Sequence, residues 1–312
     1  MFSFFKKKGS DASVPDWATF FSAAEYKAFV SELENYFKQL NVEYELGDGV
    51  VNVDENAFGF GKLGLTNVAQ VCKQGNPKHY KSIITAHFDA LIRSQQFEKT
   101  FNAIADTFEE VKKYIGVRLY DNDYVDKLGK ELTLGKDFAG DIYAMIVFDF
   151  PDSIVNIQPS QILAWDKTVE ELFAIGVENT RNSYPITISS VDFGAFNCWF
   201  AQGEHFFTPN IILDLENRKE LIGSKGALIG IPHRHAALIY SIETIEVIAA
   251  INALIPTIYG MNEEGPGSLS NQLFWYRDGV FTQLPYSIQA GEMKFTPPSN
   301  FVALLNELAS HN

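Results

Sequence analysis

The sequence predicts an α+β fold of mostly antiparallel hairpins interleaved with helices, preceded by a smaller part that joins helices to a short meander. Two patterns predict it. Stretches with helical periodicity alternate along the chain with short apolar segments bounded by Gly, Asn and Asp. Many of these segments come in pairs, and helices between paired strands are typical of an antiparallel sheet covered on one face. We therefore divide the chain into a flexible N-terminus (1–15), an N-terminal α+β part (16–116) and a C-terminal α+β body (117–312).

The N-terminal part is predicted to combine helices with a small meander. The stretch AEYKAFVSELENYFKQL predicts a helix with one apolar stripe, made of Phe29, Leu33, Phe37 and Leu40. The segments VEYEL, GVVNVDE and AFGFGKLGL, separated by polar turns, predict the meander. PKHYKSIITAHFDALIRS predicts a second helix. In QFEKTFNAIADTFEEVKKYIG apolar residues recur every four and three positions, which predicts a helix packed on its own domain, with dimerisation through this seam as the alternative.

The C-terminal body begins with VRLYDNDY, a predicted strand and turn. DIYAMIVFDFP follows, and its nearly continuous apolar run predicts a strand buried on both faces. SIVNIQPSQILAW is predicted as a strand, a turn and a short helix. Thr168 and Glu171 form a capping box that begins the next helix. PITISSVDF and AFNCWFAQ then predict a hairpin around Gly194.

The second half of the body continues this alternation of helices and strands. FTPNIILDLENRKEL predicts a helix that begins at Thr208 and Pro209. ALIGI and AALIYSI predict two more strands, and an apolar helix is expected over 243–259. LFWYRDGVFTQL predicts a hairpin with Asp-Gly at its turn, and a last helix is expected from Asn300.

The composition is that of a globular protein with an acidic surface. The 39 acidic and 25 basic residues give a net charge of −14. This charge argues against general nucleic-acid binding and fits a basic protein partner. Only two cysteines occur, Cys72 and Cys198, which fits a reducing compartment. MFSFFKKKGSDAS lacks the charge order of a signal peptide, and the apolar run 247–260 is too short to span a bilayer, so we expect a soluble, cytoplasmic protein of open oligomeric state.

Four segments resemble a known family. They are FDFPDSIVNIQPSQILAWDKTVEELFAIGVENTRN, GEHFFTPNIILD, ALIGIPHRHAALIYS and NQLFWYRDGVFTQL, in that order. Over roughly residues 140–285 the chain resembles the YtpQ-like proteins, a bacterial family of unknown function. The shared motifs are mainly structural, so the resemblance implies a common fold rather than a common chemistry. The family pattern usually has Asp where this chain has His235.

The histidine pair in ALIGIPHRHAALIY is the strongest candidate site. On an extended chain His233 and His235 would lie on one face, about 6 to 7 Å apart, within reach of one divalent metal ion such as zinc. His205 is the predicted third ligand, with Glu204 as the alternative, and Asp214 could orient an imidazole. The competing interpretation is that the pair forms the solvent-facing start of a buried strand, with no cofactor.

Other candidate chemistries are weaker. Cys198 lies in the middle of a predicted strand, where a buried, inert thiol is expected. The stretches GFGKLGLT and GSKGALIG lack the spacing of a phosphate-binding loop, and neither is expected to lead into a helix. The segments NCWFAQGEHFF and QLFWYRDGVF hold more aromatic residues than one strand face needs, so some could form an exposed recognition patch, although a Phe-rich core is favoured.

These observations favour a non-catalytic protein that acts by protein–protein interaction, because no motif of known mechanism occurs and the chain is acidic and rich in aromatic hairpins. The alternative is a metal-dependent, hydrolase-type enzyme that uses His233, His235 and His205. The sequence alone assigns no activity, substrate or partner.

Overall fold

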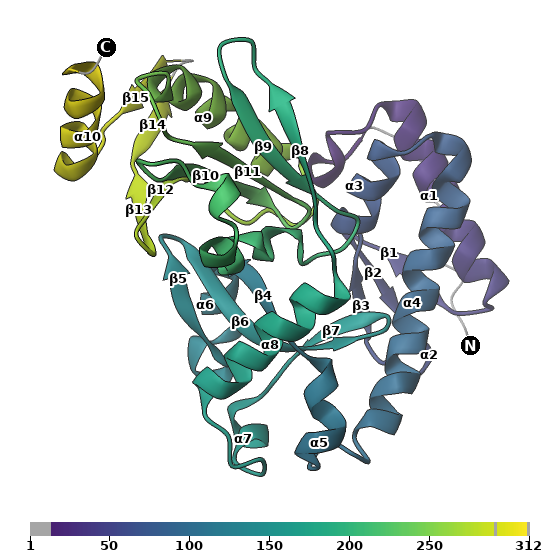
Figure 1. Ribbon diagram of the computed structural model, residues 1–312. Coiled ribbons are helices and arrows are strands. Elements are labelled where there is room, and N and C mark those ends of the chain that lie inside the picture. The colour runs from purple at the N-terminus through teal and green to yellow at the C-terminus, as the bar shows by residue number, and fades with distance from the viewer. Residues whose placement is uncertain (1–13, 290–291, 311–312) are drawn as a thin grey trace. The chain divides into compact units, whose positions relative to one another are not determined.

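The computed structural model describes residues 14–289 and 292–310. Within them the predicted α+β fold class is confirmed, because helices alternate with antiparallel sheets (Figure 1). The segment predicted as a flexible N-terminus, 1–15, lies almost wholly outside the described residues. The chain forms two compact units, the first ending at Asn102 and also taking in Pro151–Ser153. The division therefore falls earlier than the predicted boundary at residue 116.

The first unit packs two long helices, α1 (Ala23–Gln39) and α4 (Tyr80–Phe101), beside a small antiparallel sheet. Its other elements are η1 (Asp16–Ala18), β1 (Tyr44–Leu46), β2 (Val50–Val53), α2 (Glu55–Phe58), β3 (Lys62–Gly64), α3 (Thr66–Gln74) and η2 (Pro77–His79). The predicted stripe of α1 is buried except at Leu40, which is 39% exposed because the helix has already ended. The helix α3 begins at Thr66, the last residue of GFGKLGLT, contrary to the expectation that this stretch does not lead into a helix.

The helix predicted over QFEKTFNAIADTFEEVKKYIG does not form, and with it the proposed dimerisation seam is lost. Instead α4 continues through the first six residues of this stretch and ends at Phe101, before a break. Two short pieces follow, α5 (Phe108–Val111) and η3 (Lys112–Tyr114). The Trp165 indole Nε1 donates a hydrogen bond of 2.9 Å to the Ala105 carbonyl, which satisfies a backbone group in the break. At Ala105 a tertiary hydrogen bond thus takes the place of the helical one that the periodicity predicted.

One sheet of the second unit is built on the predicted buried strand. Strand β6 (Ile142–Phe150) pairs with β4 (Ile115–Asp121), β5 (Gly135–Ala139) and β7 (Ser153–Asn156), and of its residues only Asp149 is not buried. Helix α8 (Val169–Ser183) packs on β4, and both halves of its predicted capping box are present. The short elements α6 (Asn122–Leu128), η4 (Lys130–Leu132) and α7 (Pro159–Ile162) complete this part.

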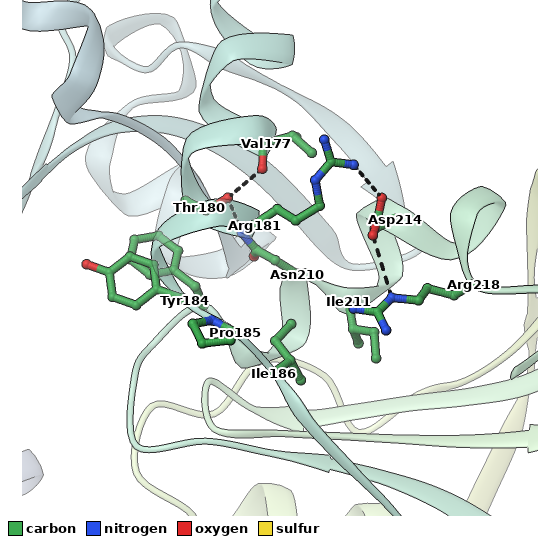
Figure 2. A pocket seen from close by; sticks show the side chains of 11 residues that line it. Val177, Thr180, Arg181, Tyr184, Pro185, Ile186, Asn210, Ile211, Asp214 and Arg218 are labelled. Atoms are coloured by element: carbon green, nitrogen blue, oxygen red, sulfur yellow. Dashed lines mark hydrogen bonds and ion pairs between the residues drawn. The ribbon is translucent and has the colours of Figure 1, made fainter. Parts of the chain in front are cut away.

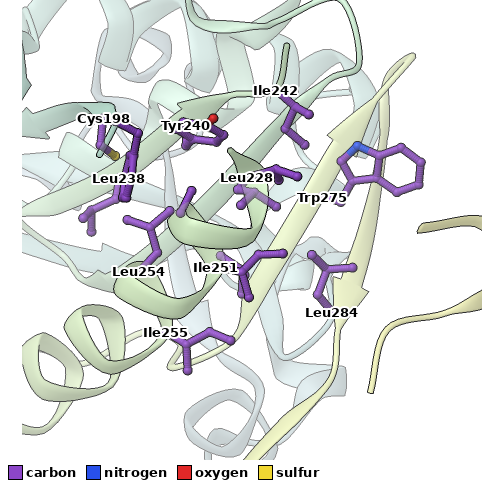
Figure 3. Close-up of a cluster of buried hydrophobic side chains, with 14 of the residues drawn as sticks. Cys198, Leu228, Leu238, Tyr240, Ile242, Ile251, Leu254, Ile255, Trp275 and Leu284 are labelled. Carbon is purple, nitrogen blue, oxygen red and sulfur yellow. The ribbon is translucent and has the colours of Figure 1, made fainter. Parts of the chain in front are cut away.

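The second sheet of this unit has six strands in the order β13-β12-β10-β11-β9-β8. The bounds are β8 (Thr187–Asp192), β9 (Asn197–Gln202), β10 (Ala227–His233), β11 (Ala236–Ser241), β12 (Leu273–Arg277) and β13 (Val280–Leu284). The two predicted hairpins, β8–β9 and β12–β13, form, and the two further predicted strands, β10 and β11, pair as a third hairpin. Asp278 and Gly279 have the positive φ angles of a tight turn. Helix α9 (Val247–Glu264) covers one face, where Leu228, Leu254 and Trp275 join the core (Figure 3).

Three further elements complete the second unit. The segment predicted as a helix from Thr208 is a 3-10 helix, η5 (Thr208–Asn217), followed by η6 (Lys219–Leu221). The predicted C-terminal helix is confirmed as α10 (Ser299–Ser310). The pair β14 (Tyr286–Gln289) and β15 (Glu292–Phe295) was not predicted, although apolar and polar residues alternate in both strands, because each strand has only four residues.

Candidate functional site

The two histidines of the predicted metal site lie at a hairpin turn rather than on one strand. His233 is the last residue of β10, Arg234 and His235 form the turn, and β11 begins at Ala236, which pairs with His233. The centroids of the two imidazole rings are 6.2 Å apart. This separation agrees with the sequence-based expectation, but the turn produces it instead of the two-residue repeat of a strand.

Hydrogen bonds already occupy one lone pair on each of these rings. The backbone N–H of His235 donates to Nδ1 of His233 over 3.2 Å, which leaves the ring proton of neutral His233 on Nε2. His235 donates through Nδ1 to the Gly203 carbonyl, and its Nε2 accepts from Nε of Arg234 over 3.3 Å. The Nε2 atom of His235 therefore faces a cationic side chain, which is a poor environment for a metal ion.

His205, the predicted third ligand, lines the same open pocket as His233 and His235. The pocket has a volume of about 690 Å³, and Glu204 and Gly203 also line it. The two ring nitrogens of His205 are buried and make no well-formed hydrogen bond, although the Pro185 carbonyl partly offsets the effect of burial on the pKa. The three histidines that the sequence analysis proposed as ligands thus line one pocket.

All three imidazoles favour the neutral form. Burial lowers the pKa of His233 from 6.5 to about 4, and the neighbouring His235 and Arg234 add to this effect. Burial is also the main cause that lowers the pKa of His235, followed by the charge of Arg234. The same cause lowers the pKa of His205. Neutral rings at pH 7 supply hydrogen-bond donors and acceptors, but no positive charge.

Asp214 does not join the histidines. Its carboxylate lies between two arginines, 3.0 Å from Arg181 and 3.7 Å from Arg218, in a separate cavity of about 200 Å³ (Figure 2). Among residues 14–289 and 292–310, no group of three or more His, Cys, Asp or Glu side chains is arranged to hold a metal ion. The zinc site with His233, His235 and His205 stays a prediction that only a metal assay can test.

The structure reveals a second feature, which sequence reasoning missed. Phe206 lies in the loop between β9 and η5, and its side chain is 39% exposed. The guanidinium carbon of Arg234 lies 4.4 Å from the centroid of its ring, and that of Arg118 lies 5.1 Å away. The His235 ring meets Phe206 edge to face at 5.4 Å. We call these four residues, Arg118, Phe206, Arg234 and His235, the Phe206 cluster.

The two arginines of the Phe206 cluster have no carboxylate partner within ion-pair distance among the described residues. The four other arginines of the chain are each paired with an acidic residue. The pairs are Arg93 with Asp152, Arg181 and Arg218 with Asp214, and Arg277 with Asp278. In addition, Nε of Arg118 is buried without a hydrogen-bond partner. No local pattern in the sequence could have revealed this, because residues 118 and 234 are brought together only by the fold.

Aromatic and carboxyl groups surround Arg118 on strand β4. Its guanidinium lies over the Tyr120 ring, 4.7 Å from the centroid. Tyr184 donates a hydrogen bond of 2.6 Å to Asp149, and burial raises the pKa of this carboxyl group. The charge of Arg118 lowers the pKa of Asp149, but it is the weakest of the three effects on that pKa. Asp149 and Arg118 are therefore neighbours that form no ion pair.

The loop after α9 contains two glycines that leave space for the side chains of His233 and Arg234. A Cβ atom at Gly265 would overlap the His233 ring, and one at Gly267 would overlap the side chain of Arg234. Gly267 also has a positive φ of 71°, and its carbonyl accepts a hydrogen bond of 3.0 Å from the backbone N–H of Arg234. Two glycines thus leave the space in which His233 and Arg234 lie.

The remaining sequence candidates are structural. Cys198 is buried, donates to the Ile239 carbonyl, and burial raises the pKa of its thiol to about 12. GSKGALIG forms a tight turn between Gly223 and Gly226 that leads into β10. Within the two aromatic-rich segments Phe206 is exposed, whereas Phe207, Phe274, Trp275 and Tyr276 are buried, so these segments mostly supply the core.

Comparisons with protein families, with curated proteins and with solved structures find no match to this chain. The resemblance to the YtpQ-like family therefore stays a prediction. No helix in the part of the chain that the structure describes is long and apolar enough to cross a membrane.

Proposed function

We propose that the protein is a non-catalytic, cytoplasmic binding protein, and that the Phe206 cluster is the centre of its surface for a protein partner. The observation that carries this proposal is the exposure of Phe206 beside two arginines that have no carboxylate partner in the part of the chain that the structure describes. Aromatic residues and arginine are the residue types that dominate the binding energy of protein interfaces. The net charge of −14 supports a partner whose surrounding surface is basic.

The position of Phe206 and the two arginines lowers the stability of the folded chain, and an arrangement that is unfavourable for stability supports a binding role. A large aromatic side chain that is left partly in water forgoes part of the stabilisation that burial supplies. Two cations beside one ring repel each other, whereas pairing with an acidic residue would have relieved that repulsion. The other candidate, a metal-dependent hydrolase, gains no support from the histidines, because Nδ1 of His233 and Nε2 of His235 already accept hydrogen bonds.

Capture from an extract of the cells that produce the protein tests the proposal. We expect the wild-type chain to retain a partner that is lost with Phe206→Ala. Phe60→Ala is the matched control, since Phe60 is 56% exposed on the first unit. The captured partner is then purified, and its affinity for each variant is measured by calorimetry. Phe206→Ala should weaken binding by about 30-fold or more, as expected for an interface hot spot of about 2 kcal/mol.

Equal affinity of the purified partner for the wild type and for Phe206→Ala would remove the Phe206 cluster from the interaction. The fold of each variant is checked by its unfolding midpoint in urea, so that loss of binding is not confused with loss of structure.

A further inference from the structure

We propose that Arg118 and Arg234, together with Phe206, form a binding site for a phosphoryl group. This inference rests on the proposed function, because it names the chemical group that the Phe206 cluster recognises. The group can be a phosphorylated residue of the partner or the phosphate of a small molecule, since both present the same oxygens to arginine.

The first argument is the distribution of charge over the arginines. Four of the six arginines have a carboxylate within 4 Å, and the two that have none among the described residues lie over the same phenyl ring. If the 39 acidic residues of the chain were placed without regard to the arginines, we would expect Arg118 and Arg234 to have carboxylate partners as well. Their side chains are only partly exposed, so water compensates their charge incompletely.

The second argument is the mutual repulsion of the two guanidinium groups. Burial holds the pKa of Arg234 below its ordinary value, and the charge of Arg118 is the next largest cause. The Phe206 ring attracts both cations and the Tyr120 ring attracts Arg118, but a ring quadrupole does not neutralise a full charge. An anion that both guanidinium groups bind would replace this repulsion by two attractions.

The third argument concerns which anion fits. A phosphate monoester carries a charge of about −1.5 to −2 at pH 7 and three acceptor oxygens, which matches two arginines. A single carboxylate can contact two arginines, as Asp214 does with Arg181 and Arg218, but its one negative charge leaves one positive charge of the pair uncompensated. The planar guanidinium group binds phosphate oxygens through two parallel hydrogen bonds, a geometry that lysine does not offer.

The surroundings of the cluster are compatible with an anion. In its neutral form His233 carries a proton on Nε2, and His233 lines the pocket beside the cluster. The nearby Asp149 accepts a hydrogen bond from Tyr184, and burial raises the pKa of its carboxyl group. The net charge of −14 is spread over the whole chain, and salt screens interactions beyond about 8 Å at physiological ionic strength.

A titration followed by NMR tests this site directly. The side-chain Nε–H signals of the six arginines are recorded while inorganic phosphate replaces chloride at constant ionic strength and pH 7. We expect saturable shifts of the Arg118 and Arg234 signals, with the signal of Arg277 unchanged. Arg118→Gln and Arg234→Gln should each weaken phosphate binding about tenfold or more, as for the loss of one charge-assisted pair. Arg277→Gln, which removes an arginine paired with Asp278, should bind phosphate like the wild type.

Two further probes distinguish the source and the class of the anion. Glycerol phosphate that binds more tightly than inorganic phosphate would support a phosphate ester as the natural group, and equal binding would support free phosphate. Acetate that binds as tightly as phosphate, or phosphate shifts that persist unchanged in Arg118→Gln and Arg234→Gln, would overturn the proposal. Loss of the phosphoryl site would leave the partner-capture result with Phe206→Ala intact, so the two proposals can fail separately.

Discussion

Replacing Phe207 by alanine is expected to lower the free energy of unfolding of the second unit by about 3–5 kcal/mol, whereas Phe206→Ala should cost about 1–2 kcal/mol at most. Phe207 is 2% exposed and stacks on Tyr184 with ring centroids 4.7 Å apart, so its removal leaves a cavity in the core. Phe206 loses only contacts at the surface. Of these two adjacent residues, Phe207 thus has a structural role and Phe206 a role in binding.

Urea unfolding followed by tryptophan fluorescence measures this difference. Trp17 belongs to the first unit, whereas Trp165, Trp199 and Trp275 belong to the second. The Trp17→Phe background therefore makes the signal specific for the second unit, which matters because a chain of two units need not unfold in one step. Equal destabilisation by the two substitutions would mean that Phe206 is a core residue, and would remove the basis of the binding proposal.

Acidification between pH 7 and pH 5 is expected to destabilise the wild-type protein by roughly 2 kcal/mol more than His233→Asn. The pKa of His233 is lowered from 6.5 to about 4 in the folded chain. Below pH 6.5 the unfolded chain therefore takes up a proton at this residue, while the folded chain does not until about pH 4. The stabilisation is complete above pH 6.5 and is lost as the pH falls through this window, to a total of roughly 3 kcal/mol.

The asparagine variant is chosen because its side-chain carbonyl can still accept the hydrogen bond that Nδ1 of His233 accepts from His235. His79→Asn is the control, since His79 is exposed at the end of η2. Its pH profile should follow that of the wild type, because this substitution leaves the surroundings of His233 unchanged. A His233→Asn profile that falls as steeply as the wild type would show that His233 is protonated in the folded protein.

The features that could be predicted from the sequence are those encoded within a few neighbouring residues. The capping box of Thr168 and Glu171, the Asp278-Gly279 turn and the buried strand β6 all follow from local spacing and side-chain chemistry. The helix expected up to residue 115 fails for the opposite reason. Its apolar residues do recur with the spacing of a helix. However, the Ala105 carbonyl accepts a hydrogen bond from the side chain of Trp165, sixty residues away, instead of from a helical N–H group.

The candidate site shows the same limit. The pattern in PHRHA led to His233 and His235, and the pocket they share with His205 confirms that these side chains are neighbours. The turn at Arg234 could not be read from an apolar run that continues on both sides. The meeting of Arg118 with Arg234 depends on β4 and the β10–β11 turn coming together, and 116 residues separate the two positions in the chain.

A double-mutant cycle over Arg118 and Arg234 tests the central claim most directly, because it measures the interaction of the two uncompensated charges. Unfolding free energies are determined for the wild type, Arg118→Gln, Arg234→Gln and the double variant, with and without saturating phosphate. In phosphate-free, low-salt buffer the two guanidinium groups should destabilise each other by about 0.5–1 kcal/mol. With phosphate bound the coupling should become favourable, since both groups then hold one anion. A coupling energy that phosphate leaves unchanged would contradict the account.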